Sequence, residues 1–401
     1  MSMLSKPKLC FEKKGLSSLF ISLQSSGMEL IMNKRILKNL LLLLVSALLF
    51  AACGNNSNST AANSADDRQS TTAQSSAAEK TTAQGSTSEK DSNAEKKTVT
   101  LALAQESNEL TGIWGLADKK KYIEEELSKV GYQLKVLGFA AAGPAVNEAF
   151  VSGKIDLASY GNLPPVVLKS KGIDVTIVSV GDSQFNLSLI APADSAIKTP
   201  KDLEGKKVIV GRGTILDEYW ANLVKAYGID VSKVKLINDV ANANSTLISG
   251  NADALVSVDL TAHLINKQFP VKIIESTATS HPEFASQMVL AAAGTFAKEH
   301  PEVITAMLKA YIRAYDYALE HKEEAIQAFA TKSIPIDVIE KIYENNISFE
   351  NLDGGIEEAD KARLDKLNQF LLEYKYIEKS ADVNTLIDTS FFEQAKKELG
   401  K

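Results

Sequence analysis

The chain of 401 residues is poor in cysteine, in aromatic residues and in excess charge of either sign. It holds two cysteines, Cys10 and Cys53, and neither lies in the part that we expect to fold, which excludes disulfides and cysteine-based metal sites there. Aromatic residues make up 7% and the net charge is −6, so no stacking platform and no basic surface for nucleic acid is indicated. The four histidines show no metalloprotease spacing. We therefore expect no cofactor, no metal and no nucleic-acid partner.

Residues 32–53 carry the pattern of a secretion signal. Basic residues follow Met32, a short apolar run ends at Phe50, and Ala-Ala-Cys ends at Cys53. The run is too short for a comfortable membrane span. The order resembles the lipobox of bacterial lipoproteins, with Phe50 where leucine is usual, and it implies a diacylated thiol at Cys53. An ordinary secretory signal with an incidental cysteine is the alternative. We interpret Met32 as the true start, so that residues 1–52 are an upstream extension plus a signal peptide.

The next segment contains almost nothing that could enter a core. From Gly54 to Lys97 there is no valine, isoleucine, leucine, methionine or aromatic residue. Such a segment cannot bury enough apolar surface to offset the entropy of ordering. We predict that residues 53–97 are a lipidated cysteine and a disordered tether, which as a random coil would span roughly 35–40 Å.

A helix–glycine–strand unit occurs twice. Residues 147–160 read NEAFVSGKIDLASY, and residues 244–257 read NSTLISGNADALVS. Each unit predicts a short helix, a glycine in the left-handed conformation and a buried strand. Chance recurrence of a common junction is the alternative. Four identities share one offset, namely Asn147 with Asn244, Ser152 with Ser249, Gly153 with Gly250, and Asp156 with Asp253.

Strands and helices alternate without hairpin signals, which predicts largely parallel sheets. Because ligands bind beyond the carboxyl ends of strands in such sheets, two repeated units imply two lobes that face a cleft. Apolar stretches near residues 188–192 and 287–292 predict two strands that cross between the lobes and form a hinge. We place the lobes at residues 98–191 with 289–401, and at residues 192–288.

Helical periodicity predicts three longer helices, at residues 116–130, 301–321 and 357–376. The last two carry no chemical motif. We expect them to pack on the first lobe.

Four motifs between Thr98 and His321 resemble the solute-binding proteins of ABC importers, in the group that takes nitrate, sulfonates, taurine and thiamine-type pyrimidines. One departure is Val258, where the family often has an aromatic residue before the aspartate of the cleft. The resemblance implies a two-lobed α/β fold of the periplasmic-binding-protein type II, with each lobe a largely parallel sheet flanked by helices and the ligand in the cleft between them. The motifs are FAAAGPAVNEAFVSGKIDLASYG at 139–161, DLEGKKVIVGRGT at 202–214, ADALVSVD at 252–259 and TFAKEHPEVI at 295–304.

The resemblance implies a receptor on the extracytoplasmic face of the cell membrane, held there by a lipid anchor, rather than an enzyme. A monomer would capture a small-molecule ligand and deliver it to an ABC permease and its ATPase. A sensory subunit stays open as an alternative. An enzyme on the same fold also stays open, although the pyrimidine-precursor synthases similar to this family use a cysteine-rich stretch, which residues 98–401 lack.

Polar residues after the predicted strands of the first lobe are candidates for ligand binding. Gln105 ends the first strand, and Ser107 follows in the same loop. Tyr160, Gly161 and Asn162 follow the first repeat strand. Ordinary loop roles are the alternative for Gln105 and Ser107, and a helix cap is the alternative for Asn162.

In the second lobe, Arg212, Gly213 and Thr214 precede a predicted helix. A helix start offers free N–H groups and a positive dipole to an anion, and an arginine can bind an oxyanion through two hydrogen bonds. Alternatively, Arg212 lies on the surface and Thr214 only forms a capping-box-like start with Asp217.

Asp259 ends the second repeat strand, where it either caps the following helix or faces the cleft. In the cleft it would suit an amine or a hydroxyl group, and Glu106 could assist it. We therefore expect an aliphatic sulfonate or a taurine-like zwitterion as the ligand. Nitrate and a thiamine-precursor pyrimidine are the alternatives.

Overall fold

The computed structural model describes residues 96–344 and 349–401, which belong to one compact unit spanning Glu89–Lys401. The predicted signal peptide, Cys53 and the tether up to residue 95 lie outside the described residues. Within the described residues, no helix has both the length and the apolar character needed to cross a membrane.

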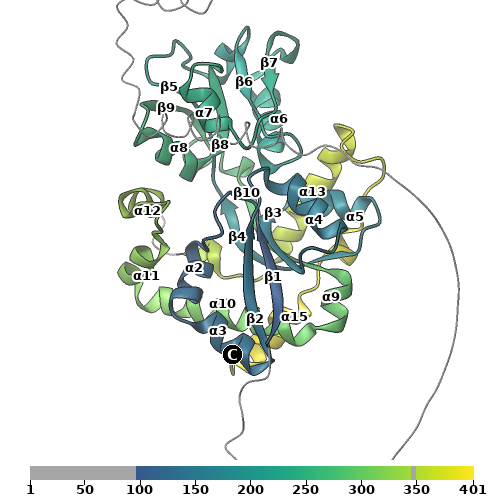
Figure 1. Ribbon diagram of the computed structural model, residues 1–401. Coiled ribbons are helices and arrows are strands. Elements are labelled where there is room, and N and C mark those ends of the chain that lie inside the picture. The colour runs from purple at the N-terminus through teal and green to yellow at the C-terminus, as the bar shows by residue number, and fades with distance from the viewer. Residues whose placement is uncertain (1–95, 345–348) are drawn as a thin grey trace, which may run out of the picture. The chain divides into compact units, whose positions relative to one another are not determined.

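The first sheet has five strands in the order β2-β1-β3-β10-β4 (Figure 1). Strand β1 is parallel to β2 and β3, whereas β10 is antiparallel to both β3 and β4. Four of the strands therefore run in one direction, and their carboxyl ends share one edge. The strands are β1 (Lys97–Leu103), β2 (Tyr132–Gly138), β3 (Leu157–Gly161), β4 (Val175–Phe185) and β10 (Ser286–Ala293).

The second sheet repeats this topology in the order β7-β6-β8-β5-β9. Strand β6 is parallel to β7 and β8, and β5 is antiparallel to β8 and β9. Strands β8 and β5 thus take the places that β3 and β10 have in the first sheet. The strands are β5 (Leu187–Pro192), β6 (Lys207–Ile209), β7 (Lys235–Ile237), β8 (Ala254–Val258) and β9 (Val271–Ser276).

The duplicated sequence unit forms the same element in both sheets. It is α4 (Ala142–Val151) with β3 in the first sheet and α7 (Ala243–Ile248) with β8 in the second. Gly153 and Gly250 have φ of 67° and 74°, so the predicted left-handed conformation is confirmed at both positions.

The repeated aspartates explain why this residue type recurs. Asp156 Oδ2 accepts a hydrogen bond from the Thr100 amide at 2.8 Å, and Asp253 Oδ2 accepts one from the Lys207 amide at 2.7 Å. Each carboxylate therefore fastens the start of its strand to the neighbouring parallel strand, β1 or β6. The two aspartates have a structural role.

The chain passes from the first sheet to the second at Asn186, between β4 and β5. It returns between residues 277 and 285. The segments that we predicted as crossing strands are β5 and β10, and each pairs within one sheet. Apolar runs identify buried strands, but they do not say which sheet a strand joins.

The prediction of a single helix at residues 116–130 was wrong. The structure has α2 (Gly112–Lys119) and α3 (Tyr122–Lys129), because Lys121 takes a left-handed φ of 64° between them. The two other helix predictions are confirmed by α10 (Pro301–Glu320) and α13 (Glu358–Glu373).

The remaining α-helices are α5 (Leu163–Ser170), α6 (Ile215–Tyr227), α8 (Asp259–Asn266), α9 (Gly294–Glu299), α11 (Lys322–Phe329), α12 (Ile336–Tyr343), α14 (Val383–Leu386) and α15 (Ser390–Glu398). Short 3-10 helices are η1 (Pro200–Leu203), η2 (Val231–Lys233), η3 (Pro282–Phe284) and η4 (Glu350–Leu352).

Both faces of the first sheet are buried. Along β1, Leu101 and Leu103 belong to an apolar cluster with residues of α2, α3 and α10. Ala102 belongs to a second cluster, which includes residues of α4 and α5 and continues to Leu189 and Val208 of the second sheet. Alternate residues of one strand thus enter two cores, as the period of two in a strand requires.

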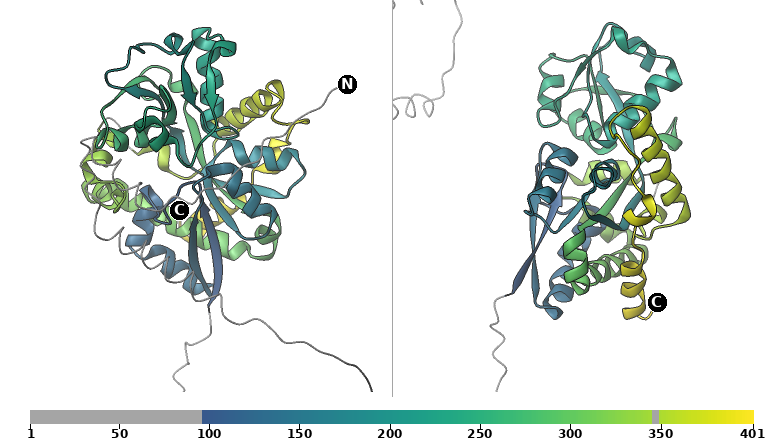
Figure 2. Two further views of the ribbon diagram at one scale, coloured as in Figure 1. Left: turned by 45° about the horizontal axis from the view of Figure 1, so that its top comes forward. Right: turned by 90° about the vertical axis from the view of Figure 1, so that its right-hand side faces the viewer.

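The C-terminal segment fastens the links between the two sheets. Arg363 of α13 donates hydrogen bonds through Nη1 to the carbonyl oxygens of Ser183 at 2.8 Å and Ala285 at 3.2 Å. These carbonyls lie close to the points where the chain leaves and re-enters the first sheet. Figure 2 shows the yellow C-terminal helices along the side of the molecule where the teal part meets the rest.

Candidate functional site

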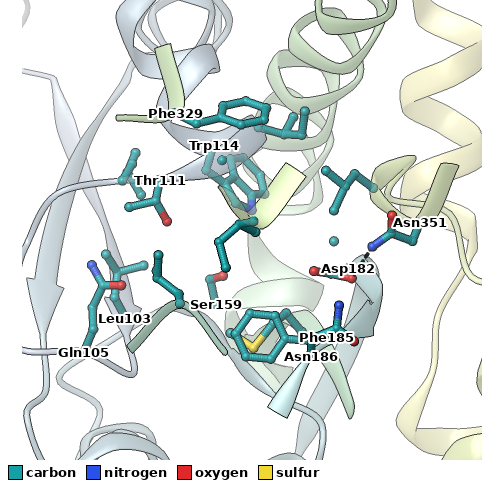
Figure 3. Close-up of a pocket in the computed structure, with 18 of the residues that line it drawn as sticks. Leu103, Gln105, Thr111, Trp114, Ser159, Asp182, Phe185, Asn186, Phe329 and Asn351 are labelled. Carbon is teal, nitrogen blue, oxygen red and sulfur yellow. Dashed lines mark hydrogen bonds between the residues drawn. The ribbon is translucent and has the colours of Figure 1, made fainter. Parts of the chain in front are cut away.

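A cavity of about 250 Å³ opens at the carboxyl ends of β1, β3 and β4 (Figure 3). Gln105 follows β1, Ser159 lies in β3, and Asp182 lies near the end of β4. Asp259 and Leu260, at the start of α8, line it from the second half of the fold. A cavity at the carboxyl ends of strands is where open α/β sheets bind ligands, and this volume suits a small solute.

Aromatic side chains from four helices line the cavity, and we call Trp114, Tyr311, Phe329 and Tyr343 the aromatic compartment. The Trp114 and Tyr311 rings lie 4.7 Å apart between centroids, and the Phe329 and Tyr343 rings lie 5.3 Å apart. The Tyr311 hydroxyl lies 2.8 Å from the carbonyl oxygen of Gly181, which accepts its hydrogen bond. The rings are therefore held in position by their own contacts.

Asp182 is the polar group beside this compartment. Its Oδ1 accepts hydrogen bonds from the Gln184 amide at 2.9 Å and from Asn351 Nδ2 at 2.6 Å. Figure 3 shows one carboxylate oxygen turned toward Asn351 and the other turned toward the cavity. Burial raises the pKa of Asp182 to about 6, although these hydrogen bonds and the charge of Arg363 act in the opposite direction.

The pKa of Asp259 is shifted in the opposite direction from that of Asp182. Burial alone would raise its pKa, but hydrogen bonds with His263 and Ser188 outweigh the burial and lower the pKa of Asp259 below its usual value. His263 Nε2 lies 3.6 Å from Asp259 Oδ2, and the Ser188 hydroxyl donates to Oδ1. At neutral pH this side of the cavity carries a stable negative charge.

No lysine, arginine or histidine is among the described residues that line the cavity. Across the described ranges, there is also no group of three or more histidine, cysteine, aspartate or glutamate residues suited to a metal ion. The charged groups at the cavity are therefore the carboxylates of Asp182 and Asp259. This arrangement favours hydrogen-bond donors and cations over anions.

Of the candidates from the first lobe, Gln105 lines the cavity. Its amide group donates to the carbonyl oxygens of Ser107 at 3.2 Å and Glu109 at 2.9 Å, which orders the loop after β1. Ser107 is not among the lining residues, and its hydroxyl oxygen accepts from the Glu109 amide at 3.0 Å.

Tyr160, Gly161 and Asn162 lie behind the cavity, in the core between the two sheets. Tyr160 is fully buried, and Asn162 donates through Nδ2 to Gln287 Oε1 at 2.9 Å. A Cβ on Gly161 would meet the Ile215 side chain of α6 at 2.4 Å. The close approach of α6 therefore favours glycine here, whereas the Asn162 hydrogen bond stays within the first sheet.

Arg212, Gly213 and Thr214 lie at the start of α6, away from the cavity lining. Their anion-binding groups are already engaged. Thr214 caps the helix, the Gly213 amide donates to Asp217 Oδ2 at 2.9 Å, and Arg212 Nη1 lies 3.5 Å from Asp217 Oδ1. The Arg212 guanidinium also lies 5.3 Å from the centre of the Tyr376 ring. The Asp217 carboxylate thus occupies the place that we predicted for a ligand anion.

Sequence reasoning missed Asp182 and the aromatic compartment. Asp182 follows an apolar strand run just as Asp259 does, so the rule that selected Asp259 would also have selected Asp182. Nothing in the sequence marks Trp114 or Tyr343 as neighbours of that strand. Their helices reach it only through packing.

Two sheets of the same topology, with a cavity at their strand ends, define a two-lobed α/β binding protein of the periplasmic type II fold. The solved structure of the periplasmic sulfonate-binding protein SsuA from Methylobacillus flagellatus KT matches with a TM-score of 0.62 and 27% identity, over 76% of this chain and 96% of that chain. Residues 127–325 match the family model described as NMT1/THI5 like.

Two curated relatives bear names that differ in ligand. An aliphatic sulfonates-binding protein of Bacillus subtilis is 26% identical over 294 residues, which cover 71% of this chain and 84% of the relative. A formylaminopyrimidine-binding protein of Halalkalibacterium halodurans is 25% identical over 232 residues, which cover 52% of this chain and 68% of the relative.

Proposed function

We propose that the protein is the extracytoplasmic solute-binding component of an ABC importer. The observation that carries this proposal is the cavity at the strand ends of a duplicated α/β fold, lined from both halves. The protein captures a small organic molecule in the cavity and delivers it to a permease and its ATPase. The relatives named above support this role, and in it the protein is a receptor rather than an enzyme.

The anchor and the assembly state belong to the same proposal. Cys53 carries the lipid, residues 54–97 tether the folded part to the membrane, and the receptor acts as a monomer. Support comes from the basic–apolar–cysteine order and from the composition of the tether.

The first ligand class that we propose is an aliphatic sulfonate, with a taurine-like zwitterion ahead of a simple alkyl sulfonate. Two relatives named for sulfonates support this class. The cavity of this chain favours the zwitterion, because an ammonium group would face the charged Asp259 carboxylate. Gln105 and Asp259 are the sequence candidates that we place in contact with it.

The second ligand class is a pyrimidine of the thiamine-precursor type. The aromatic compartment is the specific observation that favours it, because a ligand ring would pack against Trp114 and Tyr343 without an anionic partner. The relative named for formylaminopyrimidine supports the same class.

A ligand screen by thermal shift and calorimetry tests the role and separates the classes. The panel holds taurine, ethanesulfonate, nitrate and an aminopyrimidine. A ligand at a hundred times its Kd stabilises the folded state by about 2.7 kcal/mol, which a melting curve detects. Taurine or the aminopyrimidine should raise the melting temperature. If no small solute in a broad panel binds, the receptor role is wrong.

Arg212 remains our predicted anion clamp, and a substitution tests it separately. A clamp function requires the ligand to replace Asp217 as its partner. Arg212→Ala should then weaken taurine and ethanesulfonate alike, by about ten- to a hundredfold, the size of one charge-assisted hydrogen bond of roughly 1.5–3 kcal/mol. Asp259→Ala should weaken taurine and spare ethanesulfonate. Unchanged sulfonate affinity in Arg212→Ala removes Arg212 from the site.

A further inference from the structure

We propose that helix α12 is a movable cover of the cavity, which an ion pair between Asp337 and Lys267 holds against α8. Release of α12 opens the cavity while the two sheets keep their positions. The movement is therefore separate from any bending at the two links between the sheets. This inference takes the cavity from the proposed receptor role and adds how a solute reaches it.

Helix α12 contacts helices of both halves of the fold. It packs on α11, which itself packs on α2 of the first half, and on α8, which packs on strands β5 and β9 of the second sheet. Figure 1 shows α12 between α8 and α11. The two links join the halves covalently, whereas α12 joins them through side chains that can separate.

One face of α12 forms part of the cavity wall. Ile339, Ile342 and Tyr343 line the cavity, and Leu260 of the contacting helix α8 lines it too. Leu260 also packs against the apolar cluster that includes Ile339. Movement of α12 away from α8 would therefore remove part of the wall and admit solvent to Trp114, which lines the same cavity.

Helix α12 is held less firmly than the helices of the core. Two of its eight residues are buried, compared with eleven of the twenty residues of α10. A turn at residues 331–334 joins α12 to α11, and in it the Thr331 amide donates to the carbonyl oxygen of Ile334 at 3.0 Å. Segments with few buried residues open at a small part of the free energy of global unfolding. Helix α12 can therefore swing on this turn while the sheets stay folded.

The ion pair gives the cover a weak and reversible fastening. Lys267 Nζ donates to Asp337 Oδ2, and each side chain is about half exposed. The hydrogen bond from Lys267 lowers the pKa of Asp337, so this carboxylate is ionised at neutral pH. An exposed ion pair of this kind shifts an equilibrium by roughly 1.4- to 5-fold. The pair therefore adjusts how often α12 is released and does not lock it.

Quenching of Trp114 fluorescence by acrylamide, a small neutral molecule, measures access to the cavity on the full chain. Asp337→Lys sets two like charges against each other and should raise the quenching constant about two- to fivefold, the size of one exposed ion pair. Asp337→Lys combined with Lys267→Asp restores an ion pair and should return the quenching constant to the wild-type value. Glu340→Lys makes the same change at another exposed carboxylate of α12 and is the matched control, with no change expected.

The second tryptophan supplies a control for the reporter. The chain has two tryptophans, and Trp220 is buried in the apolar core away from the cavity lining. In a Trp114→Phe protein only Trp220 emits, and its quenching should be the same with and without Asp337→Lys. A response of Trp220 equal to that of Trp114 would mean that the whole fold loosens, which overturns the proposal. Melting curves check that each variant folds.

Small-angle scattering on the same variants separates movement of α12 from bending at the links. The radius of gyration should be equal in Asp337→Lys and the wild type while the quenching of Trp114 differs. A radius of gyration that grows together with the quenching assigns the access to bending, and unchanged quenching in Asp337→Lys removes the fastening; either result overturns the proposal. No solute is used, so failure of the cover leaves the receptor role to the ligand screen.

Discussion

Replacing Asp182 by asparagine should stabilise the ligand-free protein at pH 7.5. Burial raises the pKa of Asp182 to about 6, whereas an aspartate in the unfolded chain titrates near 3.9. A raised carboxyl pKa means that the folded state binds the proton more tightly than the unfolded state does. The free energy of unfolding therefore falls as the pH rises from about 4 to 6. Two pKa units correspond to about 3 kcal/mol, and partial exposure to the cavity lowers the expected gain to about 2–3 kcal/mol. Asparagine removes the charge and keeps the acceptor for Gln184 and Asn351.

Melting curves at several pH values measure this gain. A change of 1 kcal/mol moves the melting temperature of a large domain by about 2–4 °C, so a gain of about 2–3 kcal/mol should raise the melting temperature of Asp182→Asn by about 4–12 °C at pH 7.5. The difference should shrink to about half at pH 5 and vanish near pH 4, because the wild-type carboxyl is protonated in the folded state there.

Asp259→Asn is the opposite-sign control in the same cavity. Its partners lower the pKa of Asp259, so its charge stabilises the folded state above about pH 4, and the stabilisation is lost as the pH falls through the folded pKa. The variant should melt below the wild type at pH 7.5. If Asp182→Asn also melts at or below the wild-type temperature at pH 7.5, burial of the charged Asp182 carboxylate does not destabilise the folded state, and our account of its burial is wrong.

Four further predictions concern other parts of the chain. Cys53→Ala should move the protein from the membrane fraction to the soluble fraction, and identical fractionation would contradict the anchor. A truncated protein that begins at Lys96 should keep the melting temperature and the ligand affinity of the mature chain, because the segment before it offers no apolar surface to a core; a loss of many degrees would show that the tether packs. Gly153→Ala should lower the free energy of unfolding, measured with denaturant, by about 1–2 kcal/mol. The φ of 67° strains an alanine backbone, and no neighbouring atom lies close enough to clash with the added Cβ. An unchanged free energy of unfolding would mean that the turn rearranges. Arg363→Ala should cost about 3 kcal/mol, since it removes charge-assisted hydrogen bonds to both links between the sheets, whereas Lys366→Ala on the exposed face of α13 should be neutral.

The sequence determined the repeating framework of this protein. The glycines at 153 and 250 fix left-handed turns, and the apolar runs that follow them fix buried strands, because φ preference and burial are properties of single residues and their immediate neighbours. The same local signals predicted α10 and α13. A duplicated α/β unit, and with it the general position of a binding cavity at the strand ends, could therefore be inferred without a structure.

Local patterns decided less about the site. Arg212 and Thr214 form a plausible anion site in the sequence, but the Asp217 carboxylate turns back onto Gly213 and satisfies the same donors. Asn162 follows a strand end, as a ligand contact should, yet it lies in a buried network with Gln287. In both cases the outcome depends on which of several reachable partners a polar group meets, and residue type alone does not rank them.

Only the tertiary structure decided the chemistry of the cavity. Trp114, Asp182 and Tyr343 are separated by scores of residues, and they line one cavity because tertiary packing brings α2, β4 and α12 together around it. The pairing of β5 with the second sheet and of β10 with the first was decided in the same way. Each of these contacts lowers the free energy only when the whole fold is complete, so a local sequence signal for them has no physical basis.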